Sequence, residues 1–198
     1  MLRSNRLSGL VAGGSSRVLA IANEAHKNGE AGFTVGQQAI FVGEDNSASM
    51  NHLSGIIAQG EAQVMMAGST CINNRQSGIL AREEARVDAD RSVCHGNGLL
   101  GVALQGKTVN SIEALDASHN EHAGLGVYEN ASAVLAGKIM MQENWHKLTQ
   151  EEKRTTEKKE CAFQSKSASL TLAPSCTLTW DDVQLSGPTS ASCRNSGA

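Results

Sequence analysis

Residues 53–75 read LSGIIAQGEAQVMMAGSTCINNR, and the next stretch, 76–98, reads QSGILAREEARVDADRSVCHGNG. When the second stretch is placed under the first, ten positions are identical and no insertion separates the two copies. A fixed period of this length is typical of solenoids and propellers, in which each repeat needs a neighbour to bury its apolar face. The doubled stretch therefore predicts a repeat protein.

Glycine recurs every 23 residues over most of the chain, at Gly9, Gly32, Gly55, Gly78, Gly101 and Gly124. The residue after each Gly is apolar, and so is the residue two further on, which predicts a short strand with one buried face. Two more short strands follow in each copy. We expect the second strand to slip in register where Val109 and Asn110 exchange places, and again at Ala133 and Val134. Three short strands per copy predict one coil of a parallel β-helix.

The most regular column is polar and consists of Asn28, Asn51, Asn74, Asn97 and Asn120. Stacked coils lie about 4.8 Å apart, so each Asn side chain can hydrogen-bond the Asn above and below it in a ladder. Asn also tolerates the left-handed backbone conformation that sharp corners require. We expect this structural ladder to end at Glu143, where the period fails.

The predicted fold class is all-β: a single-stranded right-handed parallel β-helix of about six coils over residues 5–146. Residues 147–160 are highly charged and predict a short capping helix or a linker. Residues 161–198 are rich in Ser, Thr and Ala without a sustained period, which predicts a disordered tail. A leucine-rich repeat is the main rival, but its strand pattern is met only once, at residues 18–25.

Composition narrows the function classes. Lys and Arg total 17 against 20 Asp and Glu, so no basic footprint for nucleic acid is present. No apolar run is long enough to span a membrane, and residues 1–18 lack the apolar stretch of a signal peptide, so cytoplasmic residence is the default prediction. The five cysteines form no CxxC pair, and neither a metal site nor another cofactor is predicted.

Several local motifs resemble binding or metal sites but are better explained by their positions in the repeat. The stretch GVALQGKT at 101–108 matches the phosphate-binding P-loop pattern, but a strand column follows it where a P-loop needs a helix. Cys71 and Cys94 share an inward column and predict an apolar core pair. His26 and His95 lie three coils apart, too far for one metal, and His119 and His122 lack a third ligand.

The fourth coil carries the densest charge, and we take it as the candidate binding surface. Its residues are Arg82, Glu83, Arg86, Asp88, Asp90 and Arg91. Asp88 and Asp90 alternate along a strand, so both are expected to face outward. At the neighbouring positions the third coil offers Met65 and Ala67, and the fifth offers Ser111 and Glu113. We therefore expect no cluster of three or more carboxylates with a basic partner.

The repeated pattern of Gly, alternating apolar residues, A-x-V and a corner Asn resembles the right-handed parallel β-helix repeat. That resemblance implies either polysaccharide-active enzymes, such as pectate lyases, polygalacturonases and alginate epimerases, or the substrate adaptors of the F-box type. None of the enzymes' signature motifs occurs in this sequence, so no catalytic residue is carried over. The expected function is a non-catalytic module that binds a protein partner, either alone or as a piece of a larger adaptor. The alternative is a fragment of a polysaccharide-active enzyme or a carbohydrate-binding solenoid, although Tyr128 alone among the outward positions offers an aromatic ring.

Overall fold

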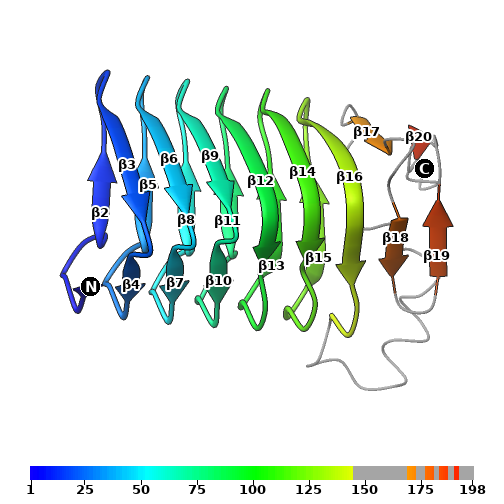
Figure 1. The fold of residues 1–198 in the computed structure, drawn as a ribbon, viewed down its shortest axis with the longest axis horizontal. Coiled ribbons are helices and arrows are strands. Elements are labelled where there is room, and N and C mark those ends of the chain that lie inside the picture. Colours follow the sequence, from blue (N-terminus) through cyan, green and yellow to red (C-terminus); the bar gives the residue numbers. More distant parts are fainter. Residues whose placement is uncertain (145–168, 173–176, 181–182, 187–189, 192–198) are drawn as a thin grey trace, which may run out of the picture.

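The computed structural model describes residues 1–144 in full and, beyond them, the backbone of residues 169–172, 177–180, 183–186 and 190–191. In residues 1–144 the chain winds through successive coils whose strands stack in parallel (Figure 1). We count the coils from the period-23 glycines, so that the first coil begins at Gly9 and the sixth at Gly124. Partner strands in adjacent coils pair residues 23 apart, as in Ile79 with Ile56 and with Val102. The predicted parallel β-helix of about six coils is confirmed.

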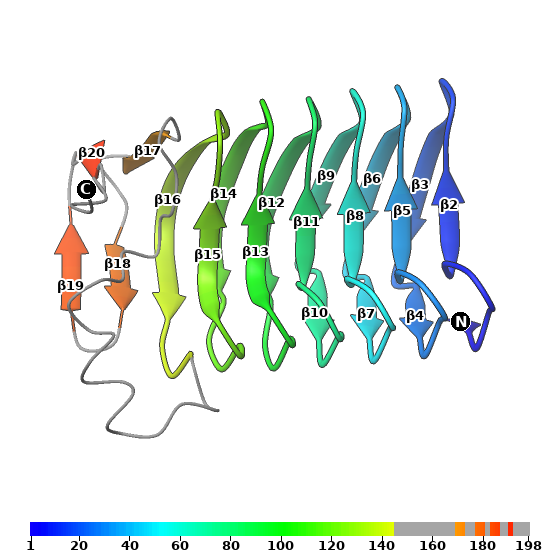
Figure 2. The same ribbon diagram turned by 180° about the vertical axis from the view of Figure 1, so that it is seen from behind.

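Each coil contributes a strand to each of three faces. The first face is a six-stranded parallel sheet, which is turned toward the viewer in Figure 2. Its strands are β2 (Leu10–Ala12), β5 (Phe33–Val35), β8 (Ile56–Ala58), β11 (Ile79–Ala81), β13 (Leu100–Leu104) and β15 (Ala123–Val127). Two apolar residues of each of these strands point into the coil, as the period-2 pattern predicts.

The second and third faces belong to one larger sheet that bends at a corner. The second face holds β3 (Arg17–Ile21), β6 (Ile40–Glu44) and β9 (Gln63–Ala67), and the third holds β1 (Leu2–Arg3), β4 (Glu24–His26), β7 (Ser47–Ser49) and β10 (Thr70–Ile72). In the later coils one long strand runs through both faces: β12 (Arg86–Val93), β14 (Val109–Asp116) and β16 (Ser132–Met141). The polar site described below lies on the second face.

Left-handed residues form the corners in three columns that run the length of the stack. Among residues 1–144, every residue with positive φ belongs to one of these columns. The columns begin at Ser4, Gly14 and Ala22 and recur at the repeat period, except that Glu143 follows His119 by one residue more. Contrary to the sequence-based expectation, the ladder asparagines are not these residues. The left-handed position is the one before each ladder Asn and holds Lys27, Met50 and Asn73, among others.

The Asn ladder is confirmed and is longer than predicted. Asn51 Oδ1 accepts hydrogen bonds from the backbone N–H and the Nδ2 of Asn28, at 3.0 and 2.9 Å, and the same pair of bonds repeats up the stack. Asn5 joins at one end. At the other end Asn144, not Glu143, accepts from Asn120. A bulge in β16 makes the sixth coil one residue longer than the others, which moves the ladder position by one.

The period-23 glycines are required by close packing, not by backbone conformation. A Cβ on Gly55 would lie 2.7 Å from the carbonyl oxygen of Gly78 and 3.0 Å from both the Asn74 Nδ2 and the Cys71 Cβ. Contacts of this kind recur at Gly9, Gly32, Gly78 and Gly101. Glycine at this position therefore leaves room for two neighbours: the ladder Asn of its own coil and the backbone carbonyl of the next coil.

The core is a narrow column of small aliphatic side chains, as the shortage of aromatic residues predicts. Phe33 and Phe41 are the largest buried residues of the second coil, with ring centroids 5.7 Å apart. The predicted register slip in the second strand is wrong. Asn110 pairs with Val87 and with Ala133, so it stays in the inward column and is buried.

Four strands continue beyond the sixth coil. β17 (Ser169–Leu172) and β18 (Thr177–Trp180) pair in parallel with β16, and β19 (Val183–Ser186) and β20 (Ser190–Ala191) pair antiparallel with β18 and β17. These strands fall in the segment for which the sequence predicts disorder. The rest of that segment, like the charged stretch 147–160, lies outside the described residues, so both predictions stay predictions there. Within the described chain, no helix has the length and hydrophobicity needed to cross a membrane.

Candidate functional site

The predicted charged surface on the fourth coil is divided between two places in the structure. Arg82 and Glu83 lie at the corner between the first and second faces, where they bind the coil below. The guanidinium of Arg82 donates to Gln59 Oε1, and Glu83 Oε2 accepts from the backbone N–H of Gly60 at 2.8 Å. These two side chains therefore hold a corner and do not line a site.

The remaining four residues lie on β12. Arg86 and Asp88 project outward and are exposed, Asp90 projects outward and is half-buried, and Arg91 occupies a left-handed position at the bend of the strand. Arg91 Nη1 lies 2.5 Å from Asp90 Oδ2. Only Asp88 and Asp90 of the predicted set line the groove described next.

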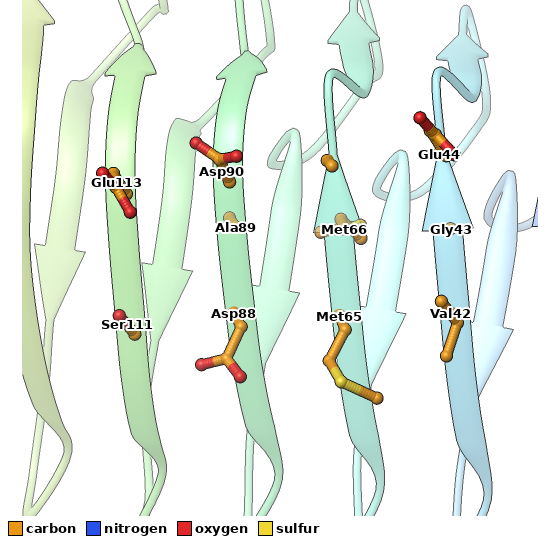
Figure 3. Close-up of a pocket in the computed structure, with 11 residues that line it drawn as sticks. Val42, Gly43, Glu44, Met65, Met66, Asp88, Ala89, Asp90, Ser111 and Glu113 are labelled. Atoms are coloured by element: carbon orange, nitrogen blue, oxygen red, sulfur yellow. The ribbon is translucent and has the colours of Figure 1, made fainter.

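A shallow groove of about 420 Å³ crosses β6, β9, β12 and β14 on the second face (Figure 3). We call it the acidic groove. It is lined by Val42, Gly43, Glu44, Met65, Met66, Ala67, Asp88, Ala89, Asp90, Ser111 and Glu113. Since one side of each strand is buried, the polar lining comes from alternate, outward positions of adjacent coils. The repeat itself thus assembles the groove.

One end of the acidic groove is apolar. Val42 and Met65 are register partners on β6 and β9 and are 40% and 39% exposed. They occupy outward strand positions, where a solvated sheet face normally carries polar residues. This patch was detectable in the sequence, because Leu19, Val42 and Met65 form an apolar column at positions expected to face outward.

The other end of the acidic groove gathers carboxylates. Asp90 and Glu113 are direct register partners on β12 and β14, and Asp88 lies two residues before Asp90 on the same outer face. Like charges at directly opposed positions destabilise a sheet. In the described part of the chain, neither the Asp88 nor the Glu113 carboxylate makes an ion pair or a hydrogen bond. Three carboxylates therefore line this end of the groove, with Arg91 next to Asp90. The expectation that no three of them form a close cluster with a basic partner stays a prediction.

These carboxylates do not form a metal centre in the residues that the structure describes, where no three His, Cys, Asp or Glu side chains group closely enough to hold an ion. No aromatic ring lines the acidic groove. Tyr128, the predicted aromatic candidate, lies after β15, and a Cβ on Gly126 would meet its hydroxyl at 2.5 Å. Burial raises the pKa of this Tyr128 hydroxyl above its ordinary value of 10.0. The groove therefore offers carboxylates and thioether surface, but no platform on which a sugar ring could stack.

Cys71 and Cys94 are free and fully buried, as predicted. The hydrogen bond between the two thiols, together with burial, raises the pKa of Cys94 well above its ordinary value of 9.0. A thiol of this kind is protonated and inert, because the nucleophile is the thiolate. The two cysteines belong to the core.

The P-loop match is also explained by the fold. Gly101 and Leu104 lie in β13, Thr108 is fully buried, and β14 follows directly, so no helix N-terminus is available for a phosphate. Lys107 instead pairs with Glu84 of the coil below, at 3.4 Å.

His26, His95 and His119 lie at the corner between the third and first faces, but in different coils of the stack. His26 Nδ1 lies 3.0 Å from Ser49 Oγ. His95 Nε2 lies 2.8 Å from Asp116 Oδ1, in a geometry that is not aligned as a hydrogen bond. The ring centroids of His95 and His119 are 5.5 Å apart, a contact that the sequence period did not predict.

Comparison with known proteins identifies the repeat but no individual relative. A family model described as the right handed beta helix region matches residues 2–144. No curated protein and no solved structure matches the chain.

Proposed function

The chain belongs to the right-handed β-helix family, and we propose that it is a non-catalytic module that binds a protein segment in its acidic groove. The segment we infer carries basic side chains together with apolar ones. This chemistry complements the two ends of the groove, where Val42 and Met65 are exposed beside Asp88 and Glu113. The observation that carries the proposal is this juxtaposition on one sheet face of unpaired carboxylates and exposed apolar side chains.

Protein interfaces combine features of this kind. Methionine is enriched in them and adapts to partner shapes, while complementary charges guide the encounter and fix the register of the partner. Sugar-binding sites favour stacking rings, which the acidic groove lacks. These features favour a peptide over a carbohydrate as the occupant.

A binding experiment with a synthetic probe tests the proposal. The probe is an extended fluorescent peptide that carries Arg, Met and Leu, and fluorescence anisotropy measures its affinity for the full chain. We expect Asp88→Asn plus Glu113→Gln to weaken binding about two- to thirtyfold, since each exposed charge pair contributes about 0.2–1 kcal/mol. Added salt should weaken binding to the wild type in the same direction.

The matched control variant is Glu61→Gln plus Glu84→Gln, which removes two carboxylates outside the acidic groove. It should bind the probe as the wild type does. Equal affinity of the wild type, the groove variant and the control variant would reject the groove as a binding site for basic segments.

A polysaccharide-active site remains the second candidate, because the structure brings Asp88, Asp90 and Glu113 together with Arg91. Paired carboxylates can perform acid–base chemistry on a glycosidic bond. Pectate, polygalacturonate and alginate, each with and without calcium, are the substrates to assay. We expect no turnover. Turnover that disappears in Asp88→Asn plus Asp90→Asn would replace the binding function with an enzymatic one.

A further inference from the structure

A second charged surface lies on another side of the solenoid, at the corner between the third and first faces. Lys27, Met50, His52 and Arg75 line a depression of about 550 Å³ there, whose lining contains no carboxylate. We call these four residues the basic corner. Arg75 Nη1 lies 3.0 Å from His52 Nε2, so two basic groups are in contact. Within the described chain, neither Lys27 nor Arg75 forms an ion pair with a carboxylate, so the positive charge of the corner is uncompensated.

The acidic groove and the basic corner have the same arrangement with opposite charge. Lys27 and Arg75 lie on the first and third coils, and Met50, which is 50% exposed, lies on the coil between them. In the acidic groove Glu44 lies on the second coil, Met65 on the third and Asp88 on the fourth. Both surfaces therefore present a charge, a methionine and a second charge on three successive coils.

The spacing along the solenoid axis is also the same. Adjacent coils are separated by the distance between hydrogen-bonded strands, about 4.8 Å, so the two charges of either surface are about 10 Å apart along the axis. When two solenoids lie side by side with parallel axes and a shift of one coil, Lys27 comes level with Glu44 along the axis, Met50 with Met65, and Arg75 with Asp88. This correspondence follows from the repeat, which sets one spacing for every side of the molecule.

From this complementarity we propose that the acidic groove binds the basic corner of a second copy of this chain. The inference rests on the proposed function, because it names the partner of the same groove. The two surfaces share no residue, so the contact is heterologous, and each pair of copies leaves one groove and one corner open. A heterologous contact of this kind extends into rings or open arrays and does not stop at a closed two-fold dimer.

Sedimentation velocity of the full chain over a range of concentrations tests the proposal. We expect species larger than a dimer at low ionic strength and their dissociation at high ionic strength. Glu44→Lys plus Asp88→Lys reverses the groove, and Lys27→Glu plus Arg75→Glu reverses the corner. Each variant alone should raise the concentration at which association begins at least about tenfold, because opposed like charges oppose docking.

An equimolar mixture of the two reversed variants is the decisive sample. The groove-reversed chain still has a basic corner and the corner-reversed chain still has an acidic groove, so association should return in the mixture. Arg17→Glu plus Lys138→Glu is the control, since it makes the same change in net charge as the corner reversal at exposed sites outside both surfaces. This control should associate as the wild type does.

Three outcomes would overturn self-association: a wild type that stays monomeric at low ionic strength, a groove or corner reversal that leaves association unchanged, or a mixture that stays monomeric. Each is distinguishable from failure of the proposed function. A chain that binds the basic peptide probe in its groove but does not self-associate keeps its binding function and has a partner other than itself.

Discussion

Each ladder asparagine makes the same bonds to the coils on both sides. Asn74 Oδ1 accepts from the backbone N–H and the Nδ2 of Asn51, and Asn74 Nδ2 donates to the carbonyl oxygen of Ala48 and to Asn97 Oδ1. All of these residues are buried. A buried polar group without a partner costs about 1–3 kcal/mol, so the ladder fixes the stacking of the coils as well as their corners.

Replacement of a ladder residue inside the stack should lower the unfolding free energy more than replacement of the ladder residue at its end. We expect Asn74→Ala and Asn120→Ala each to lower the free energy of unfolding by about 2–5 kcal/mol, because each orphans a buried N–H and a buried carbonyl. The cost at Asn120 is similar because Asn144 continues the ladder beyond it. Asn5→Ala should cost only about 0.5–1.5 kcal/mol, since Asn5 is exposed. Urea unfolding measures all three, and a loss at Asn120 no larger than that at Asn5 would contradict the longer ladder.

The thiol pair in the core predicts a loss of stability at alkaline pH. The pKa of Cys94 is higher in the folded chain than in the unfolded chain, so the folded state holds more protons as the pH rises through the ordinary thiol range. Its contribution is fully present below about pH 9 and is lost above it. The unfolding free energy should therefore fall more steeply above about pH 9 in the wild type than in Cys94→Ala. Parallel pH profiles for the two proteins would contradict this coupling.

At the scale of the strand, β14 interrupts an otherwise apolar inward column. Asn110 occupies the position held by Phe41, Val64 and Val87 in earlier coils. Its Nδ2 donates to Thr108 Oγ1 at 3.1 Å and to the Ser132 carbonyl oxygen at 2.9 Å, but its Oδ1 is buried without a partner. The fifth coil therefore contains a polar pair that is only partly satisfied.

Restoring the residues of the fourth coil at these two positions should stabilise the strand. Thr108→Ala plus Asn110→Val copies Ala85 and Val87, and we expect a gain of about 1 kcal/mol, since it removes a buried polar pair together with its unsatisfied oxygen. Asn110→Val alone leaves the Thr108 hydroxyl without its partner and should gain less. Thermal unfolding compares the two variants. A double variant less stable than the single one would show that the polar pair contributes to stability.

The strands of this fold could be predicted from the sequence because each inward column holds one kind of residue at one interval. The positions that depart from these columns could not be predicted in the same way, and each departure has a physical reason. Asn110 suggests a register slip only if an inward position must be apolar, whereas its bonds to Thr108 and Ser132 allow it to remain inside. The bulge in β16, near the left-handed Gly137, moves the buried Met from position 140 to 141, and no period could reveal it.

Only part of the candidate site could be predicted from the sequence, because the rest depends on contacts between coils. Asp88 and Asp90 follow from strand alternation within one coil. The groove also needs Glu113 from the next coil and Val42 and Met65 from earlier ones, and which outward side chains remain unpaired is decided by contacts between coils. Arg82 and Glu83 show the converse, because they belong to the same charged stretch but are used to bind the corner of the coil below.

At the scale of the whole molecule, each 23-residue coil is an interchangeable unit. Every coil is held to its neighbours by the same parallel pairs, the same Asn bonds and the same close approach at Gly. Stability of such a stack is the sum of the coils and their interfaces. A whole coil can then be removed without disturbing the register of the rest, whereas part of a coil cannot.

Deletion of residues 53–75 tests this claim most directly, because it joins His52 to Gln76 in the frame of the repeat and leaves every column intact. Equilibrium urea unfolding, followed by circular dichroism, should show a single cooperative transition with a lower unfolding free energy than that of the intact chain. The shorter deletion of residues 53–64 breaks the columns and should abolish the cooperative transition, although it removes fewer residues. An in-frame deletion that fails to fold, or a shorter deletion that folds as well as it, would contradict the stack of equivalent coils.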